Sequence, residues 1–130
     1  MHKCRFLRKT LPHLNAFDIE CLERSRQLID TSLTTRYTIT RLASVAGMST
    51  TKFKAAFKEQ FGYNAFEYAQ IKRMQQACKL LNENYHPIKT IALLCGYKHT
   101  SHFYTAFKKT FGISAGKMRM QVNHLNSTVL

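Results

Sequence analysis

The sequence contains no tryptophan, only two prolines and only five glycines among 130 residues. Turn signals are therefore sparse and widely spaced, which favours helices joined by short connections. The chain also lacks an uninterrupted apolar run as long as a signal peptide or a membrane-spanning helix, so we expect no membrane partner. With 45% apolar residues, it has enough apolar material for one compact domain with its own core.

Acidic residues are scarce: seven Asp and Glu face twenty Lys and Arg, for a net charge of +13. No acid follows Glu83, so the last third of the chain is cationic without compensation. A small domain with this charge binds a polyanion more often than not, and nucleic acid is the commonest one. On charge alone, a well-solvated basic surface without such a partner stays open as the alternative.

The cysteines show no paired spacing and are Cys4, Cys21, Cys78 and Cys95. A disulfide framework is not expected, and the pattern fits a reducing cytosol, so we expect a cytoplasmic protein. The last three lie among apolar residues and are predicted to be small buried hydrophobes. His99 and His102 resemble half a zinc site, but no other ligand pair stands near them in sequence, so we expect no metal and no cofactor.

An internal repeat organises the chain. Residues 42–48 resemble residues 91–97 at an offset of 49, with a glycine, Gly47 or Gly96, at the same place in each. After one inserted residue the offset becomes 50. The residues that then match are Phe53, Phe57, Phe61 and Gly62 against Phe103, Phe107, Phe111 and Gly112. Each copy reads as a short helix, a turn at the glycine and a second helix, which is the helix-turn-helix pattern.

The sequence therefore predicts an all-α fold with two helix-turn-helix subdomains joined by a long helix. The expected helices are 18–33 capped by Asp18, 39–46, 50–61 capped by Ser49, 65–84, 88–95 with Pro87 in its first turn, 101–111 capped by Thr100 or Ser101, and a short helix over 114–120. Residues 18–120 form the expected DNA-binding domain. Residues 1–17 are read as a basic segment or linker, and residues 121–130 as a frayed tail.

The long helix suggests how two such units could share one DNA duplex. Twenty residues of α-helix span about 30 Å, and successive major grooves on one face of B-DNA lie about 34 Å apart. The two units would then lie near one helical turn apart. Because they belong to one chain and need no two-fold axis, the expected site is asymmetric.

The Phe residues recur at i, i+4 and i+8, so their rings share one face of each second helix and are predicted to lie in the core, together with Ala56 and Ala106. The outward residues are Thr50, Thr51, Lys52, Lys54, Ala55 and Lys58 in the first helix, and Ser101, His102, Tyr104, Thr105, Lys108 and Lys109 in the second. Residues near the start of such a helix reach base edges, and later lysines suit phosphates.

These residues resemble the AraC/XylS family of bacterial transcription regulators. Residues 39–49, which read ITRLASVAGMS, followed by the three Phe of the first copy, resemble the first half of the family's DNA-binding domain. The more distinctive second half is matched by Pro87-Ile88, Ile91-Ala92, Cys95-Gly96-Tyr97, Ser101-His102-Phe103, Ala106-Phe107-Lys108-Lys109 and Phe111-Gly112-Ile113-Ser114. The match runs from about Asp18 to Met120 and keeps both order and spacing.

The resemblance implies about seven helices and control of transcription initiation near promoters, often as an activator that contacts RNA polymerase. Matched residue by residue, the implied base-reading positions are Thr51, Lys54, Ala55, Ser101 and Thr105. Positions implied to contact or flank the backbone are Thr50, Lys52, Lys58, Thr100, His102, Tyr104, Lys108 and Lys109.

The sequence departs from the family's pattern near its end, where Ala115 replaces the usual proline and Met118 an expected tyrosine, so the packing of the last helix is in doubt. Most family members also carry a sensing or dimerisation domain, and only about 17 residues precede the first expected helix. Both a stand-alone regulator and a piece of a longer protein fit this sequence.

Two rival functions would each require features that differ from those of this sequence. An alkyl-repair enzyme would need clustered cysteines at a metal, and neither those nor a Ser/His/Asp constellation is present, so no enzyme activity is expected. A non-specific binder of polyanions or membrane surfaces would need one continuous basic amphipathic helix. Here the charge decorates a repeated motif with its own core.

Overall fold

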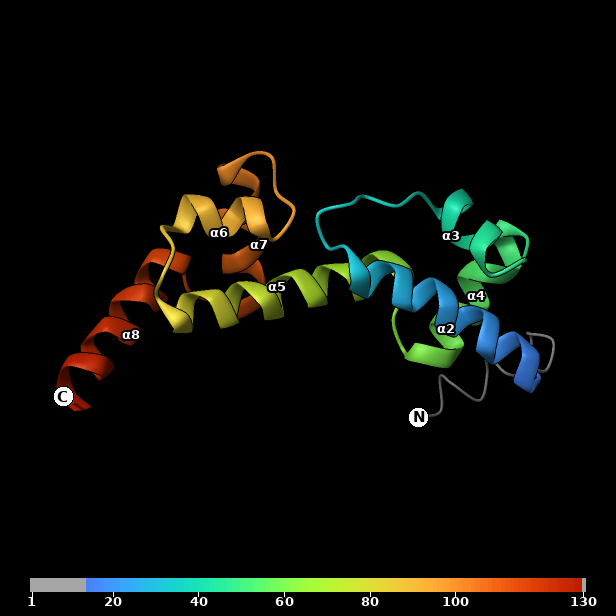
Figure 1. The fold of residues 1–130 in the computed structure, drawn as a ribbon, viewed down its shortest axis with the longest axis horizontal. Helices are drawn as coiled ribbons and strands as arrows, with labels where there is room; N and C mark the ends of the chain where they lie inside the picture. The colour runs from blue at the N-terminus through green and yellow to red at the C-terminus, as the bar shows by residue number, and fades with distance from the viewer. Residues whose placement is uncertain (1–13, 130) are drawn as a thin grey trace. The chain divides into compact units, whose positions relative to one another are not determined.

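The computed structural model describes residues 14–129, with side chains described as far as residue 124. Within these residues there are seven helices and no strand, which confirms the predicted all-α fold. The helices are α2 (Ala16–Thr31), α3 (Ile39–Val45), α4 (Thr50–Phe61), α5 (Ala65–Glu83), α6 (Ile88–Leu94), α7 (Thr100–Phe111) and α8 (Ala115–Val129) (Figure 1). The chain divides into two compact units after Gln70, so α5 begins in the first unit and ends in the second.

The first unit packs α2, α3 and α4 around one apolar cluster. Phe53 and Phe57 of α4 are fully buried in it, because residues four apart lie on one face of a helix. The start of α5 contributes small residues. The other buried members are Cys21, Leu22, Ile29, Leu42, Ala43, Ala46, Ala56, Ala65 and Ala69.

The second unit repeats this plan with the later part of α5 in the place of α2. Phe103 and Phe107 of α7 are fully buried, as their counterparts are in α4. The remaining buried members are Met74, Ala77, Leu80, Leu81, Ile91, Ala92, Cys95, Tyr97 and Ala115. The repeat read from the sequence is therefore a repeat of two separately cored helix-turn-helix units.

The tight turns of both units occur at the glycines that the sequence singled out. Gly47 has φ +65° and Gly96 has φ +92°, a left-handed conformation that glycine adopts without steric penalty. In both turns the following residue donates its backbone N–H back into the preceding helix, Met48 to Ala43 and Tyr97 to Ala92, each at 3.0 Å. The two turns are thus built in the same way.

The start of α2 differs from the prediction. Asp18 was expected to cap this helix, but Asn15 occupies the cap and Asp18 is the third helical residue. The Asn15 side chain accepts a hydrogen bond from the Asp18 backbone N–H at 2.8 Å. The Asp18 carboxylate accepts one from the Asn15 N–H at 3.3 Å, which completes a capping box. The helix ends at Thr31, two residues before the expected end.

The starts of α6 and α7 also differ from expectation. Helix α7 begins at Thr100, and His99 stands at its cap without a side-chain hydrogen bond, so neither Thr100 nor Ser101 caps it. Pro87 lies at the cap of α6, one residue before the first turn where it was expected. The long helix α5 ends at Glu83, and Asn84 follows it with φ +59°.

The last helix is longer than predicted. Helix α8 runs from Ala115 to Val129, so the expected end at Met120 and the expected frayed tail over 121–130 are wrong for residues 121–129. No glycine or proline follows Gly116, so the sequence holds no helix breaker there. Ala115 is buried and Met118 packs on the second cluster, so both departures from the family pattern are accommodated. Of the expected N-terminal segment 1–17, residues 1–13 lie outside the described residues.

Candidate nucleic-acid interface

Helix α4 separates a buried aromatic face from a polar face. Ser49 caps it, as predicted, by accepting a hydrogen bond from the Lys52 backbone N–H at 3.2 Å. Because Phe53, Ala56 and Phe57 occupy the inner side, the predicted contact residues lie on the other faces. Those that are exposed are Thr50, Thr51, Lys54 and Lys58, and those that are half-buried are Lys52 and Ala55.

Helix α7 presents the same arrangement. Its inner side carries Phe103 and Phe107, and Thr100 at its start is half-buried. The predicted contact residues that are exposed are Ser101, His102, Tyr104, Thr105, Lys108 and Lys109. The structure therefore places nearly all predicted contact residues of both helices where an outside partner can reach them.

The last Phe of each predicted inward set lies at the edge of its core. Phe61 is half-buried, and Phe111 is 36% exposed, so the inward assignment of Phe111 is wrong. Each ring still packs on the preceding Phe of its helix, with centroids 4.6 Å apart in both units. Phe61 and Phe111 are the last residues of their helices, directly before Gly62 and Gly112, so fewer neighbouring elements cover these two rings. Ala106, which was also predicted to face inward, is half-buried and packs against the second core.

Lys52 has a role that the sequence did not reveal. Its ammonium nitrogen lies 3.3 Å from the Asp18 carboxylate of α2, and the Asp18 side chain is only 14% exposed. Lys52 therefore ties the start of α4 to the start of α2 and has part of its charge neutralised. The two residues are 34 positions apart, so no sequence spacing indicated this pair.

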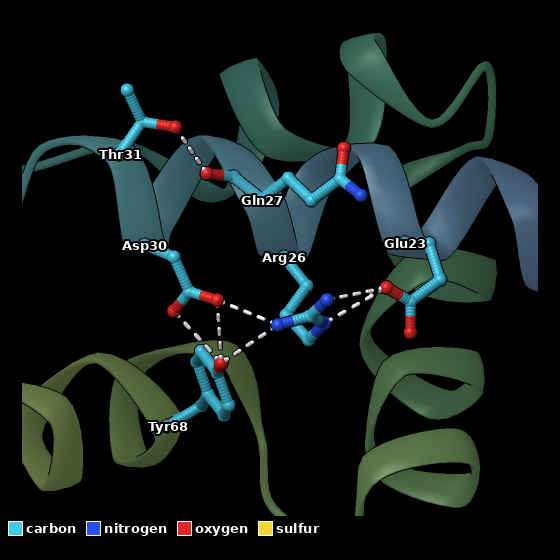
Figure 2. Close-up of polar contacts among 6 residues, drawn as sticks. All are labelled: Glu23, Arg26, Gln27, Asp30, Thr31 and Tyr68. Carbon is cyan, nitrogen blue, oxygen red and sulfur yellow. Dashed lines mark hydrogen bonds and ion pairs between the residues drawn. The ribbon is translucent and has the colours of Figure 1, made fainter.

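A second polar cluster holds α2 against the beginning of α5 (Figure 2). The Tyr68 hydroxyl donates to the Asp30 carboxylate at 2.8 Å, and the Arg26 guanidinium donates to Asp30 at 2.6 Å and to Glu23 at 2.6 Å. The same guanidinium lies 6.0 Å from the centre of the Phe61 ring. The i, i+3 and i, i+4 charges of α2 were visible in the sequence, but Tyr68 as their partner was not.

The pKa shifts of Tyr68 and Arg26 keep both side chains in the protonated states that these hydrogen bonds require. Burial raises the pKa of Tyr68, and the hydrogen bond from Arg26 offsets this in part, so the phenol stays protonated and remains a donor to Asp30. The hydrogen bond to Glu23 raises the pKa of Arg26, which keeps its positive charge. The network therefore fixes the first turn of α5 against α2 from neutral to mildly alkaline pH.

A buried hydrogen bond also ties α2 to α3. The buried Ser25 hydroxyl donates to the Leu42 carbonyl at 2.7 Å, so the helix before the turn is held by α2.

In α7, the Thr105 hydroxyl donates to the Ser101 carbonyl of the preceding turn at 3.0 Å. Thr105 is thus exposed, but its only hydroxyl proton is already engaged.

The charge of the two units differs. Residues 1–70 hold eleven Lys and Arg against six Asp and Glu, a net charge of +5. Residues 71–130 hold nine against one, a net charge of +8. Both units are cationic, as a surface that binds a phosphate backbone requires.

Residues 14–129 hold no group of three or more metal-binding side chains, and none of their helices is long and apolar enough to cross a membrane. The His99 and His102 rings contact each other edge to face, with centroids 5.3 Å apart. Burial raises the pKa of Cys95 to about 11, so its thiol stays protonated at neutral pH and behaves as a core residue.

Comparison with known proteins assigns the fold to a family. A family model described as a helix-turn-helix domain matches residues 42–121, which is most of the chain. The chain is 32% identical over 106 residues to the "Probable transcriptional regulator LumQ" of Photobacterium leiognathi, which covers 78% of this chain and 43% of that protein. This chain belongs to the AraC family of transcription regulators.

Other AraC-type proteins extend the comparison. The "Bifunctional transcriptional activator/DNA repair enzyme AdaA" of Bacillus subtilis is 29% identical over 111 residues, which covers 85% of this chain and 52% of AdaA. Among solved structures, the C-terminal domain of the response regulator AraT from Geobacillus stearothermophilus aligns with a TM-score of 0.73 and 27% identity, covering 85% of this chain and 88% of that one. The chain thus spans about half or less of the length of these curated relatives.

One structural neighbour was solved with its ligand. The DNA-binding domain of AdpA, in complex with a target DNA, aligns with a TM-score of 0.70 and 22% identity, covering 78% of this chain and 90% of that one. At this identity the likeness shows the AraC-type fold. The predicted family and the predicted arrangement of two helix-turn-helix subdomains are both confirmed by these comparisons.

Proposed function

We propose that this AraC-type chain binds double-stranded DNA sequence-specifically, with the N-terminal halves of α4 and α7 in the major groove. The observation that carries the proposal is the repeated face of these helices. Each sets a polar or cationic outer side against two fully buried Phe, with Lys54 and Lys58 on α4 and Lys108 and Lys109 on α7. Exposed residues near the start of such helices reach base edges, and lysines further along reach phosphates.

The base-reading residues that we propose are Thr51, Lys54, Ala55, Ser101 and Thr105. Lys54 can donate to guanine O6 and N7, and the hydroxyls of Thr51 and Ser101 can donate or accept. Lys58, Lys108 and Lys109 suit phosphates. The residues proposed to flank these contacts are Thr50, Thr100, His102 and Tyr104. Lys52, which was predicted among this flanking set, is proposed to position α4 through Asp18, because its ammonium is already paired.

The proposed site is asymmetric. The units carry different reading residues, so the two halves of the site would differ in sequence.

The proposed biological role is regulation of bacterial transcription initiation, as an activator that also contacts RNA polymerase. Its support is membership of the AraC family and the similarity to AdaA, which is named a transcriptional activator. A DNA target would place the protein at the nucleoid in the bacterial cytoplasm. We infer a binding role and not a catalytic one for this region, because Cys21 and Cys95 are core residues and Cys78 packs against the second core.

The experiment that tests the proposal is selection of bound duplexes from a random pool by the whole chain, followed by competition with unrelated DNA. We expect an enriched site that is still preferred over unrelated DNA as the salt concentration rises, because phosphate contacts weaken for both duplexes alike. Lys79→Ala is a suitable control, since Lys79 is an exposed lysine of α5 outside both proposed recognition helices. Binding of all duplexes with equal affinity would show a non-specific polyanion binder instead.

A further inference from the structure

We propose that Thr105 reads a thymine through its methyl group, so that the half of the site contacted by α7 is specified by a thymine C5-methyl. This inference rests on the proposed function and names the base that one residue recognises. A threonine can contact a base either through its hydroxyl or through its methyl carbon Cγ2. The hydrogen bond that the Thr105 hydroxyl makes in the structure decides which of these two contacts a thymine would receive.

The hydroxyl of Thr105 is committed to the helix. Thr105 is exposed at the sixth position of α7, and its Oγ1 donates to the Ser101 carbonyl at 3.0 Å. A hydroxyl has one proton, so Thr105 cannot donate to a base without breaking this bond. Such back-bonding to the preceding turn is a common state of threonine in helices. The oxygen can still accept a hydrogen bond from adenine N6 or cytosine N4, but it cannot donate to thymine O4, so a thymine at this position is contacted through the methyl group.

The first unit presents the same group at the same place. Thr105 corresponds to Ala55 at the offset of 50, and the side chain of Ala55 is a methyl group alone. Alanine and the threonine methyl are the side-chain groups that pack on the thymine methyl in the major groove. Thr51, by contrast, is exposed on α4, and no hydrogen bond of its hydroxyl is found within the described residues. Of these two threonines, therefore, Thr105 at the sixth helical position is the one whose hydroxyl proton is engaged.

The neighbours of Thr105 offer no stronger reader of purines. Residues 100–107 of α7 contain no Lys, Arg, Asn or Gln, the side chains that make two-point contacts with guanine or adenine. Lys108 and Lys109 lie in the last turn of the helix. Because thymine alone carries a methyl group in the major groove, an apolar contact at this position discriminates thymine from the other bases.

The test compares thymine with uracil, which differ only in that methyl. Each thymine of the duplex selected by the whole chain is replaced in turn by deoxyuridine, and the Kd is measured by fluorescence anisotropy. Losing one buried methyl is expected to weaken binding about fourfold. We expect this loss at a thymine in the half-site that Thr105 contacts.

Two variants assign the effect to Thr105. Thr105→Ser keeps the hydroxyl and removes Cγ2, so the variant should bind the thymine and uracil duplexes with Kd values within about 1.5-fold of each other. Thr105→Val keeps a methyl and removes the hydroxyl, so it should retain about threefold or greater discrimination. Circular dichroism of both variants should show unchanged helix content, because Thr105 is exposed.

The opposite pattern would overturn the inference. Discrimination kept by Thr105→Ser would show that another residue contacts the thymine methyl, because thymine and uracil differ in nothing else. The absence of any thymine whose uracil effect depends on residue 105 would also overturn it, while a selected site still supports the proposed function. If no site is selected at all, the proposed function fails together with the inference.

Discussion

The first helix-turn-helix unit uses polar side chains at two positions where the second unit carries His99 and Met118. Ser49 caps α4 with a side-chain hydrogen bond, but His99 at the cap of α7 makes none. Tyr68 hydrogen-bonds Asp30 in the first unit, and its counterpart at the offset of 50, Met118, packs on the second core. The acids follow the same division, because six of the seven lie in the first unit.

The comparison shows which features the repeated plan requires. Both units keep two fully buried Phe, a left-handed glycine in the turn and a polar outer face on the second helix. They differ in caps, ion pairs and hydrogen bonds, each of which contributes only about 1 kcal/mol. The apolar core therefore sets the fold, and the polar contacts adjust how firmly each recognition helix is held.

The largest effect is expected from removing the same core ring in either unit. Phe107→Ala and Phe57→Ala should each lower the free energy of unfolding by about 3–5 kcal/mol, through lost burial and a residual cavity. Phe107→Ala should abolish DNA binding by unfolding the second unit. Phe111→Ala is the matched control and should lose much less, because Phe111 is 36% exposed. Thermal melts followed by circular dichroism, together with DNA binding measured on the same samples, check this prediction. If the Phe107→Ala variant melts like the wild type but does not bind DNA, the assignment of Phe107 to the core is wrong.

The next effect concerns the recognition faces. Lys54→Ala should weaken specific binding by about 1–3 kcal/mol and relax the preference at one base pair. Lys108→Ala should weaken all duplexes nearly equally and reduce the slope of log K against log salt by about one unit. Titrations at several salt concentrations separate the two variants. An unchanged base preference in Lys54→Ala would remove Lys54 from the reading surface.

A smaller effect is expected from the polar network of Tyr68, Asp30 and Arg26 in the first unit. Tyr68→Phe removes the hydroxyl that donates to Asp30 and should lower the free energy of unfolding by about 1–2 kcal/mol. Tyr63→Phe is the control, since Tyr63 is 48% exposed and should contribute almost nothing. Urea denaturation of both variants measures the difference. Equal stability of the two variants would mean that the network does not stabilise the first unit.

The smallest effect separates the two helix caps. Ser49→Ala should cost about 1 kcal/mol, because the N–H of Lys52 loses its partner. His99→Ala should change the free energy of unfolding by less than about 0.5 kcal/mol, since His99 makes no side-chain cap. The same urea titrations apply. A larger loss in His99→Ala than in Ser49→Ala would reverse the comparison between the units.

Periodic features of the sequence predicted the fold well. The bounds of α4 are those expected, and the two turns lie at Gly47 and Gly96, because the Phe spacing and the glycines act locally. Contacts between distant residues were not predictable. Lys52 with Asp18, and Tyr68 with Asp30, depend on how helices pack, and no spacing in the sequence encodes that. The end of α8 was missed because a polar sequence without a helix breaker gives no sign of where the helix stops.

The central claim is that α4 and α7 read two different parts of one site. It is tested most directly by repeating the selection from random duplexes with the whole chain as wild type, Lys54→Ala and Thr105→Ser. We predict a non-palindromic site with two preferred blocks about one helical turn apart, with Lys54→Ala relaxing one block and Thr105→Ser the other. Both variants relaxing the same block, or a palindromic site unaffected by either, would contradict the claim.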